Sequence, residues 1–141
     1  MKISVLFVLG LSCFSSAAYG ACPDLDDKIN ALPNWDSSTL FPCMYSGFIE
    51  IDEDSESNIF YWLFKHNDDK KSLVIWLNGG PGASSMGGLF TENGPIRMKK
   101  HSNGTVGLHS IDSAWTYDAH VLYVDQPVGT GFSYGGHKVT N

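Results

Sequence analysis

A run of glycine and proline at residues 79–82 is separated by Asn78 from an apolar segment, residues 72–77, and precedes Ser84 and Ser85. The apolar segment is typical of a strand buried on both faces, and the two serines are candidate N-caps of a helix. Glycine allows positive φ and leaves its amide open to a ligand. Because bare amides between a strand and a helix attract negative charge, this pattern favours stabilisation of an anion, such as the oxyanion of acyl transfer.

Two other functions of glycine-rich loops fit this run poorly. A dinucleotide-binding loop would use Gly80 and Gly82, but it needs a third glycine where Ser85 stands and an acidic strand end about twenty residues later. A phosphate-binding P-loop needs a lysine followed by serine or threonine, and this run has none. A plain structural turn is the remaining alternative to an oxyanion loop.

The glycine run and its flanks resemble the serine carboxypeptidase family. The likeness covers roughly residues 45 to 134 in the family's order, and its matching blocks lie at residues 45–48, 76–85, 88–95 and 121–134. Within the block 76–85 the chain departs at one place, because Ala83 stands where the family usually has a cysteine. That cysteine usually bonds to a partner far downstream, so the resemblance implies that this protein lacks the bridge.

The resemblance implies an α/β fold, namely the N-terminal part of an α/β-hydrolase, with an antiparallel hairpin leading into a mixed central sheet. It also implies a serine-type carboxypeptidase that releases C-terminal residues from peptides through an acyl-enzyme. The matching position assigns an oxyanion-hole amide to Gly80. An acyltransferase on the same scaffold and an inactive, truncated peptide-binding product are the alternatives.

Three further residues match the family's binding site for the free carboxylate of the peptide: Asn78, Gly79 and Glu92. Asn78 offers a side-chain donor and Gly79 a backbone donor. A carboxylate at Glu92 would repel the substrate, so we expect this side chain to be protonated and to donate a hydrogen bond, with a second glutamate sharing the proton network. The resemblance therefore implies tighter binding at acidic pH than near neutrality.

The serine, acid and histidine of a catalytic triad are expected beyond residue 141, since α/β-hydrolases carry them in that order after this block. We therefore expect an N-terminal fragment with half of an active site, inactive by itself. Residues 131–135 match the G-x-S-x-G pattern around Ser133, but residues 127–130 separate them from the preceding strand, so Ser133 is not the expected nucleophile. Asp125 precedes the expected serine, and a loop-stabilising role is favoured over a triad role.

Residues 1–20 have the basic start, apolar core and small residues of a secretory signal peptide, with cleavage expected before Ala21. Secretion would place Cys22 and Cys43 in an oxidising compartment, where they are candidates for a disulfide. Asn103 begins an N-glycosylation sequon. Together these features predict a secreted protein or one in a lysosome- or vacuole-like compartment, with no membrane association after cleavage.

The net charge of −6 argues against nucleic acid as a partner. The five histidines lack i, i+4 pairing and there is no Cys-x-x-Cys, so no metal site is predicted, and no cofactor is implied. The expected partner is thus the C-terminus of a peptide or protein, while the sequence does not indicate an oligomeric state.

The elements expected to position these residues alternate between strands and connections, as in an α/β sheet. Strands 45–51 and 58–66 should form a hairpin around an acidic turn, and strand 72–77 should lead into the glycine run. A short helix is predicted at residues 24–32, and a short helix or a turn at residues 85–91. Further strands are expected at residues 95–99, 105–109 and 121–125.

Overall fold

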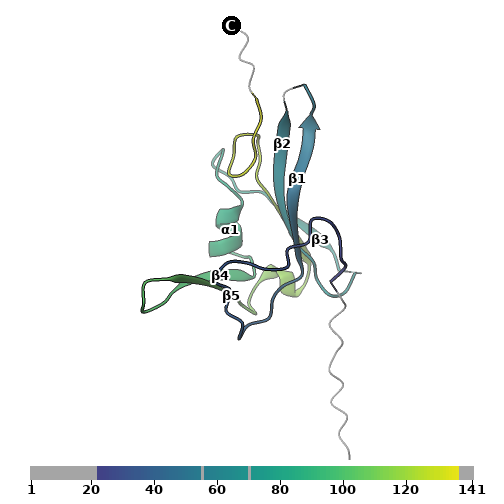
Figure 1. The fold of residues 1–141 in the computed structure, drawn as a ribbon. Coiled ribbons are helices and arrows are strands. Elements are labelled where there is room, and N and C mark those ends of the chain that lie inside the picture. Colours follow the sequence, from purple (N-terminus) through teal and green to yellow (C-terminus); the bar gives the residue numbers. More distant parts are fainter. Residues whose placement is uncertain (1–21, 55, 70, 137–141) are drawn as a thin grey trace, which may run out of the picture.

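The computed structural model describes residues 22–54, 56–69 and 71–136 of the 141-residue chain (Figure 1). The predicted signal peptide, residues 1–20, and the cleavage site before Ala21 lie outside the described residues. Within these ranges, no helix has the length and apolar character needed to cross a lipid bilayer.

Four strands form a mixed sheet in the order β1-β2-β6-β3 (Figure 1). Strands β1 (Met44–Asp52) and β2 (Ser57–Phe64) form an antiparallel hairpin, and β2 also pairs antiparallel with β6 (His120–Val124). Strand β3 (Leu73–Trp76) pairs parallel with β6. The expected hairpin leading into a mixed sheet is therefore present.

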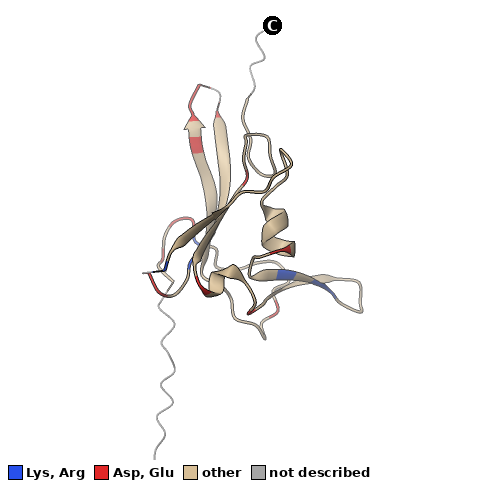
Figure 2. Cartoon of the chain, turned by 180° about the vertical axis from the view of Figure 1, so that it is seen from behind, with Lys and Arg blue, Asp and Glu red and all other residues tan. Residues whose placement is uncertain are grey.

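The remaining elements lie between β3 and β6 in the chain. Helix α1 (Met86–Thr91) follows β3, and β4 (Ile96–Lys100) and β5 (Val106–Ser110) form a separate antiparallel pair. A short 3₁₀ helix, η1 (Trp115–Tyr117), precedes β6. Figure 2 shows basic residues along β4 and acidic residues at the tip of the β1–β2 hairpin, so charge of each sign gathers on a different projecting hairpin.

The core lies between the four-stranded sheet and α1. Six large side chains are at most 1% exposed there: Met44, Phe64, Leu89, Ile96, Val121 and Tyr123. Burying a large apolar side chain completely contributes about 1.5–3 kcal/mol. These contacts fix α1 against the sheet and thereby set the path of the loop that connects β3 to α1.

The helix predicted at residues 24–32 is wrong. The segment forms a turn, in which the amide of Lys28 donates to the carbonyl of Leu25 at 3.0 Å, and then pairs with β1. The amide of Ile29 donates to the carbonyl of Met44 at 3.0 Å, and the amide of Ser46 donates to the carbonyl of Asp27 at 3.0 Å. Backbone groups that pair with β1 are not available for bonds within a helix, and buried backbone groups need partners. Pairing with a strand formed later in the chain thus overrides the local helix signal.

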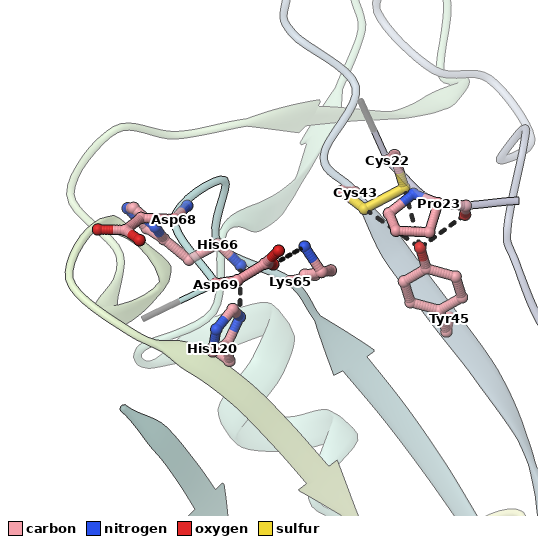
Figure 3. Close-up of polar contacts among 9 residues, drawn as sticks. All are labelled: Cys22, Pro23, Cys43, Tyr45, Lys65, His66, Asp68, Asp69 and His120. Carbon is pink, nitrogen blue, oxygen red and sulfur yellow. Dashed lines mark hydrogen bonds and ion pairs between the residues drawn. A yellow bond between two sulfur atoms is a disulfide. The ribbon is translucent and has the colours of Figure 1, made fainter. Parts of the chain in front are cut away.

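A disulfide and a tyrosine attach the start of this segment to β1. Cys22 and Cys43 are bonded, with Cα atoms 5.5 Å apart, and the hydroxyl of Tyr45 beside them donates to the carbonyl of Pro23 at 2.7 Å (Figure 3). Farther along, the hydroxyl of Tyr61 donates to Asp27 at 2.6 Å. Burial, together with this hydrogen bond and the charge of Asp27, raises the pKa of Tyr61 to about 12.

Strand β3 differs from the expectation that it is buried on both faces. Val74 and Trp76 face the core, whereas Leu73 and Ile75 are 55% and 57% exposed. The reason is its position, since β3 is an edge strand and no described element covers its second face. Strand β3 therefore has the apolar sequence of a strand buried on both faces, but only one of its faces is packed against described residues.

Candidate active site

The glycine loop (residues 77–85) connects β3 to α1 at the carboxyl end of the sheet. Gly80 has φ +148° and Gly82 has φ +84°, conformations that side chains rarely adopt. Gly79 and Gly80 are exposed, and a Cβ added at Gly79 would meet no atom within 4 Å. The loop carries no charged residue, so any attraction for an anion must come from its amides and from Asn78.

The side chain of Asn78 is oriented by a residue of the preceding strand. Its carbonyl oxygen accepts a hydrogen bond from the indole nitrogen of Trp76 at 2.8 Å, and its backbone amide donates to the hydroxyl of Ser85 at 3.1 Å. With the oxygen occupied, the NH₂ group is the end left for a ligand. It lies over the first turn of α1, because a Cβ at Gly87 would be 3.5 Å from Asn78 Nδ2.

Trp76 was not identified from the sequence as the residue that orients Asn78, although the spacing of the two residues indicates it. Residues i and i+2 of a strand point to the same side, so Trp76 and Asn78 share a side. The indole also packs over α1, where a Cβ at Gly88 would lie 2.2 Å from its nitrogen, and Trp115 contacts its ring edge-on at 5.4 Å. These contacts hold the indole in the place that orients Asn78.

Glu92 ends α1, and its backbone is held firmly while its side chain is exposed. The amide of Glu92 donates to the carbonyl of Gly88 at 3.0 Å. Arg97 donates to the carbonyls of Glu92 at 2.7 Å, Gly94 at 2.7 Å and Leu89 at 3.2 Å. Among the described residues, the Glu92 carboxyl group has no hydrogen bond or ion pair, so it is open to a ligand.

The structure does not bring Glu92 and Asn78 into contact. The Asn78 amide faces Gly87 in the first turn of α1, whereas Glu92 is the C-cap of the same helix. Five residues of helix separate these positions by about 7.5 Å along the axis. A ligand would have to lie between the two side chains in order to touch both.

The turn after α1 has one buried polar anchor. The hydroxyl of Tyr123, on β6, donates to the side-chain oxygen of Asn93 at 2.9 Å, and burial raises the pKa of Tyr123. The Asn93 Nδ2 atom is buried and has no hydrogen-bond partner within the ranges described. This anchor fixes the residue next to Glu92 to the centre of the sheet.

Of the two serines expected to cap α1, only Ser84 binds a first-turn amide, since its hydroxyl accepts from the amide of Met86 at 3.2 Å. Ser85 occupies the N-cap position, but its hydroxyl donates to the carbonyl of Val124 and makes no capping bond. The helix has six residues, so its dipole adds little at the loop. The exposed amides of the glycine loop, rather than a helix end, are therefore the groups available to an anion.

Asp125 and Ser133 lie in a second loop (residues 125–135) that follows β6. Ser133 is 4% exposed, and its hydroxyl donates to the carbonyl of Asp125 and accepts from the amide of Phe60 at 2.8 Å. No helix follows Ser133 within the described residues. Its hydroxyl is committed to the backbone, which agrees with the prediction that Ser133 is not a nucleophile. Asp125 is fully buried and accepts hydrogen bonds from loop residues, as a loop-stabilising carboxylate does.

A cavity of about 790 Å³ lies away from the glycine loop, at the opposite end of the sheet. Its walls include the Cys22–Cys43 disulfide, Lys65, His66 and Tyr117. All of these except Tyr117 are labelled in Figure 3. Neither Asn78, Gly79, Gly80 nor Glu92 lines it. Within the described part of the chain, no group of three or more His, Cys, Asp or Glu side chains is placed to hold a metal ion.

Comparison with known proteins connects this arrangement to one family. Residues 33–141 match the family model described as serine carboxypeptidase. The chain is 40% identical over 134 residues to the pheromone-processing carboxypeptidase KEX1 of Uncinocarpus reesii, covering 94% of this chain and 20% of that protein. It is 39% identical over 142 residues to serine carboxypeptidase-like 7 of Arabidopsis thaliana, covering 98% and 31%.

A solved structure is similar as well. The prohormone-processing carboxypeptidase Kex1(delta)p of Saccharomyces cerevisiae has 38% identity and a TM-score of 0.57, over 70% of this chain and 22% of that chain. The chain thus spans between about a fifth and a third of the length of these relatives. The matched region includes the strands and loops that carry the candidate site.

Proposed function

This chain belongs to the serine carboxypeptidase family, and we propose that it forms part of a serine-type carboxypeptidase that removes single residues from peptide C-termini. The observation that carries this proposal is the oriented amide of Asn78, whose NH₂ group is left open beside the bare amides of Gly79 and Gly80. Donors arranged in this way suit a carboxylate and, next to it, a developing oxyanion.

In the proposed mechanism the chain contributes two sets of donors. Asn78 and Gly79, with the protonated carboxyl of Glu92, bind the free carboxylate of the substrate. The amide of Gly80 donates to the carbonyl oxygen of the scissile bond, where negative charge develops as the acyl-enzyme forms. We place the nucleophilic serine, the acid and the histidine outside residues 1–141, in the part of the family's length that this chain does not span. The four-stranded mixed sheet is then part of an α/β-hydrolase fold.

The proposed binding mode predicts a preference for free acids. A hydrogen bond to a charged group contributes about 1.5–3 kcal/mol, and a C-terminal amide lacks that charge. The test is hydrolysis of a blocked dipeptide and of its C-terminal amide by the full-length protein. A clear preference for the free acid supports the proposal, whereas equal rates, or hydrolysis of neither peptide, would contradict it.

The contact between Trp76 and Asn78 yields a narrower prediction. Trp76→Phe keeps an aromatic ring but removes the indole N–H that orients the Asn78 amide. Since a neutral hydrogen bond contributes about 0.5–1.5 kcal/mol, KM for free-acid peptides should rise by about 2- to 12-fold. Trp115→Phe is the matched control, because it alters the neighbouring indole without touching Asn78. Equal effects of the two variants on KM would argue against an orienting role for Trp76.

We also propose that the protein passes through the secretory pathway, with a cleaved leader, a Cys22–Cys43 disulfide and a glycan on Asn103. The disulfide of the structure and the exposed position of the sequon support this. Asn103 lies between β4 and β5, and its side-chain oxygen accepts from the amide of Thr105 at 3.0 Å and from its hydroxyl at 2.7 Å. This turn presents the Asn103 nitrogen to solvent.

Glycosylation at this position is directly testable. In a eukaryotic secretion host, Asn103→Gln should increase the electrophoretic mobility of the protein, and it should abolish the mobility shift that an endoglycosidase causes in the wild type. Thr105→Ala should have the same effect, because it removes the hydroxyl that the sequon requires. An unchanged glycosidase shift in both variants would mean that the glycan is elsewhere.

A further inference from the structure

A buried carboxylate connects the glycine loop to the second loop. Asp125 follows β6 directly and is 0% exposed. Its Oδ1 atom accepts hydrogen bonds from the Ser84 hydroxyl at 2.8 Å and the Ser85 amide at 2.7 Å, both in the glycine loop. Its Oδ2 atom accepts from the amide of Phe132 at 3.0 Å, in the second loop. Each oxygen thus holds a different segment.

This arrangement compensates the charge without a cation. None of the ion pairs found among the described residues includes Asp125. Burial of a carboxylate is costly unless hydrogen-bond donors replace the lost water, and here two amides and one hydroxyl do so. Because the donors come from two loops, the compensation requires both loops to be in place at once.

The hydrogen bonds continue from Asp125 to the proposed carboxylate site. The backbone amide of Ser85 donates to Asp125. The hydroxyl of Ser85 also accepts a hydrogen bond from the backbone amide of Asn78 at 3.1 Å. The same hydroxyl donates to the carbonyl of Val124. Ser85, at one end of the glycine loop, is therefore bound to Asp125 and Val124, and it also holds Asn78 near the other end. Gly79 and Gly80 lie between Asn78 and Ser85 in the chain.

The backbone around Asp125 is shaped for this close approach. A Cβ at Gly131 would lie 2.0 Å from Asp125 Oδ2 and 2.8 Å from the Ser84 hydroxyl, and Gly131 has φ +56°. Any side chain at this position would push the carboxylate away from its donors. The second loop thus leaves room for the carboxylate as well as donating to it.

We propose that Asp125 is a positioning residue, which holds the glycine loop against the second loop and so keeps the Gly80 amide and Asn78 aligned for the reaction. The catalytic consequence rests on the proposed function, whereas the coupling of the two loops does not. Asp125→Asn tests both, because it keeps the shape but turns one acceptor oxygen into an NH₂ group that faces a donor. One of the two loops then loses its bond.

The first measurement is hydrogen exchange of the full-length protein, followed by mass spectrometry. Asp125→Asn should increase exchange in peptides that cover residues 77–86 and in peptides that cover residues 128–134. Ser133→Ala is the matched control, since its hydroxyl binds the backbone of Asp125 and Phe60 but not the carboxylate. It should increase exchange in the second loop without a comparable change at residues 77–86. Unchanged exchange at residues 77–86 in Asp125→Asn would overturn the coupling.

The second measurement is the kinetics of peptide hydrolysis. Asp125→Asn should lower kcat about tenfold or more for both free-acid and amide substrates, because complete loss of an oxyanion donor costs about 100- to 1,000-fold. Ser133→Ala should keep kcat within about twofold of the wild type, because its hydroxyl does not bind the carboxylate. An Asp125→Asn protein with increased loop exchange and unchanged kcat would overturn the positioning role.

Two further results keep the inference separable from the proposed function. Suppose that the wild type hydrolyses no peptide but Asp125→Asn still increases exchange in both loops. This result would overturn the proposed function and support the coupling of the loops. If Asp125→Asn cannot be obtained folded, Ser84→Ala removes one of the three donors and leaves the carboxylate in place. Unchanged exchange at residues 77–86 and unchanged kcat in Ser84→Ala would then overturn the proposal.

Discussion

Asn78→Ala and Glu92→Gln should differ in how they change the pH dependence of peptide binding. Asn78 donates from an amide that does not titrate, so Asn78→Ala should weaken binding of free-acid peptides at every pH. The loss should be about 1.5–3 kcal/mol, since the acceptor is charged. An ionised Glu92 would repel the substrate carboxylate, so under the proposed binding mode the wild type should bind free-acid peptides better at about pH 5 than at about pH 7.5. The amide that Glu92→Gln introduces carries no charge at any pH, so this variant should lose much less affinity over this range.

The measurement is KM and kcat/KM of the full-length protein against pH, with free-acid and amide substrates. Amide substrates serve as the internal control, because they lack the carboxylate that both side chains are proposed to bind. They should be little affected by Asn78→Ala. If Asn78→Ala weakened acids and amides equally, these residues would not be a carboxylate site. If Glu92→Gln followed the wild-type pH dependence, another group would control it.

Loss of the Cys22–Cys43 disulfide should have the largest effect on stability. The two residues are 21 positions apart, and closing a loop of that size contributes about 3 kcal/mol in the chain-entropy model. The double variant Cys22→Ser/Cys43→Ser should therefore lower the free energy of unfolding by about that amount. The glycine loop lies at the other end of the sheet, so kcat at a temperature where the variant is folded should change little.

Urea unfolding of the wild type and the double variant, each with and without a reductant, checks this prediction. A reductant should destabilise the wild type by about that amount more than it destabilises the double variant. If the reductant had no effect on the wild type, the two cysteines would not be bonded in the protein. A fall in kcat without a fall in stability would instead connect this segment to the active site.

The strands were predictable from the sequence because their signals are local. Each predicted strand lies within two residues of an observed one, since apolar and aromatic runs are bounded by acidic or glycine-containing turns. The helix predicted at residues 24–32 was wrong because the interactions that decide its structure are not local. The helix signal of these residues is local, but their hydrogen bonds go to β1, which the segment alone cannot reveal.

The sequence indicates which residues form the candidate site, but not the contacts that hold those residues in place. Asn78, Gly79 and Gly80 stand out through glycine content and resemblance. Trp76, Ser85 and Arg97 act through contacts whose geometry depends on the folded chain, such as the carbonyls at the end of α1 and in the following turn to which Arg97 donates. Chain order predicts that Asp125 is not part of a triad, whereas two of its three donors, Ser85 and Ser84, lie 40 and 41 residues away and required the structure.

The segment between the two cysteines also constrains the order of folding during synthesis. Asn34 donates to the carbonyl of Val106, 72 residues later, and Trp35 pairs with Leu108. At about 5–20 residues per second, the ribosome needs roughly 4–14 s to deliver that partner. The β1–β2 hairpin, with its short connection, can form well before then. The nascent chain must therefore keep residues 34–36 unpaired for several seconds, a period in which a chaperone would find them accessible.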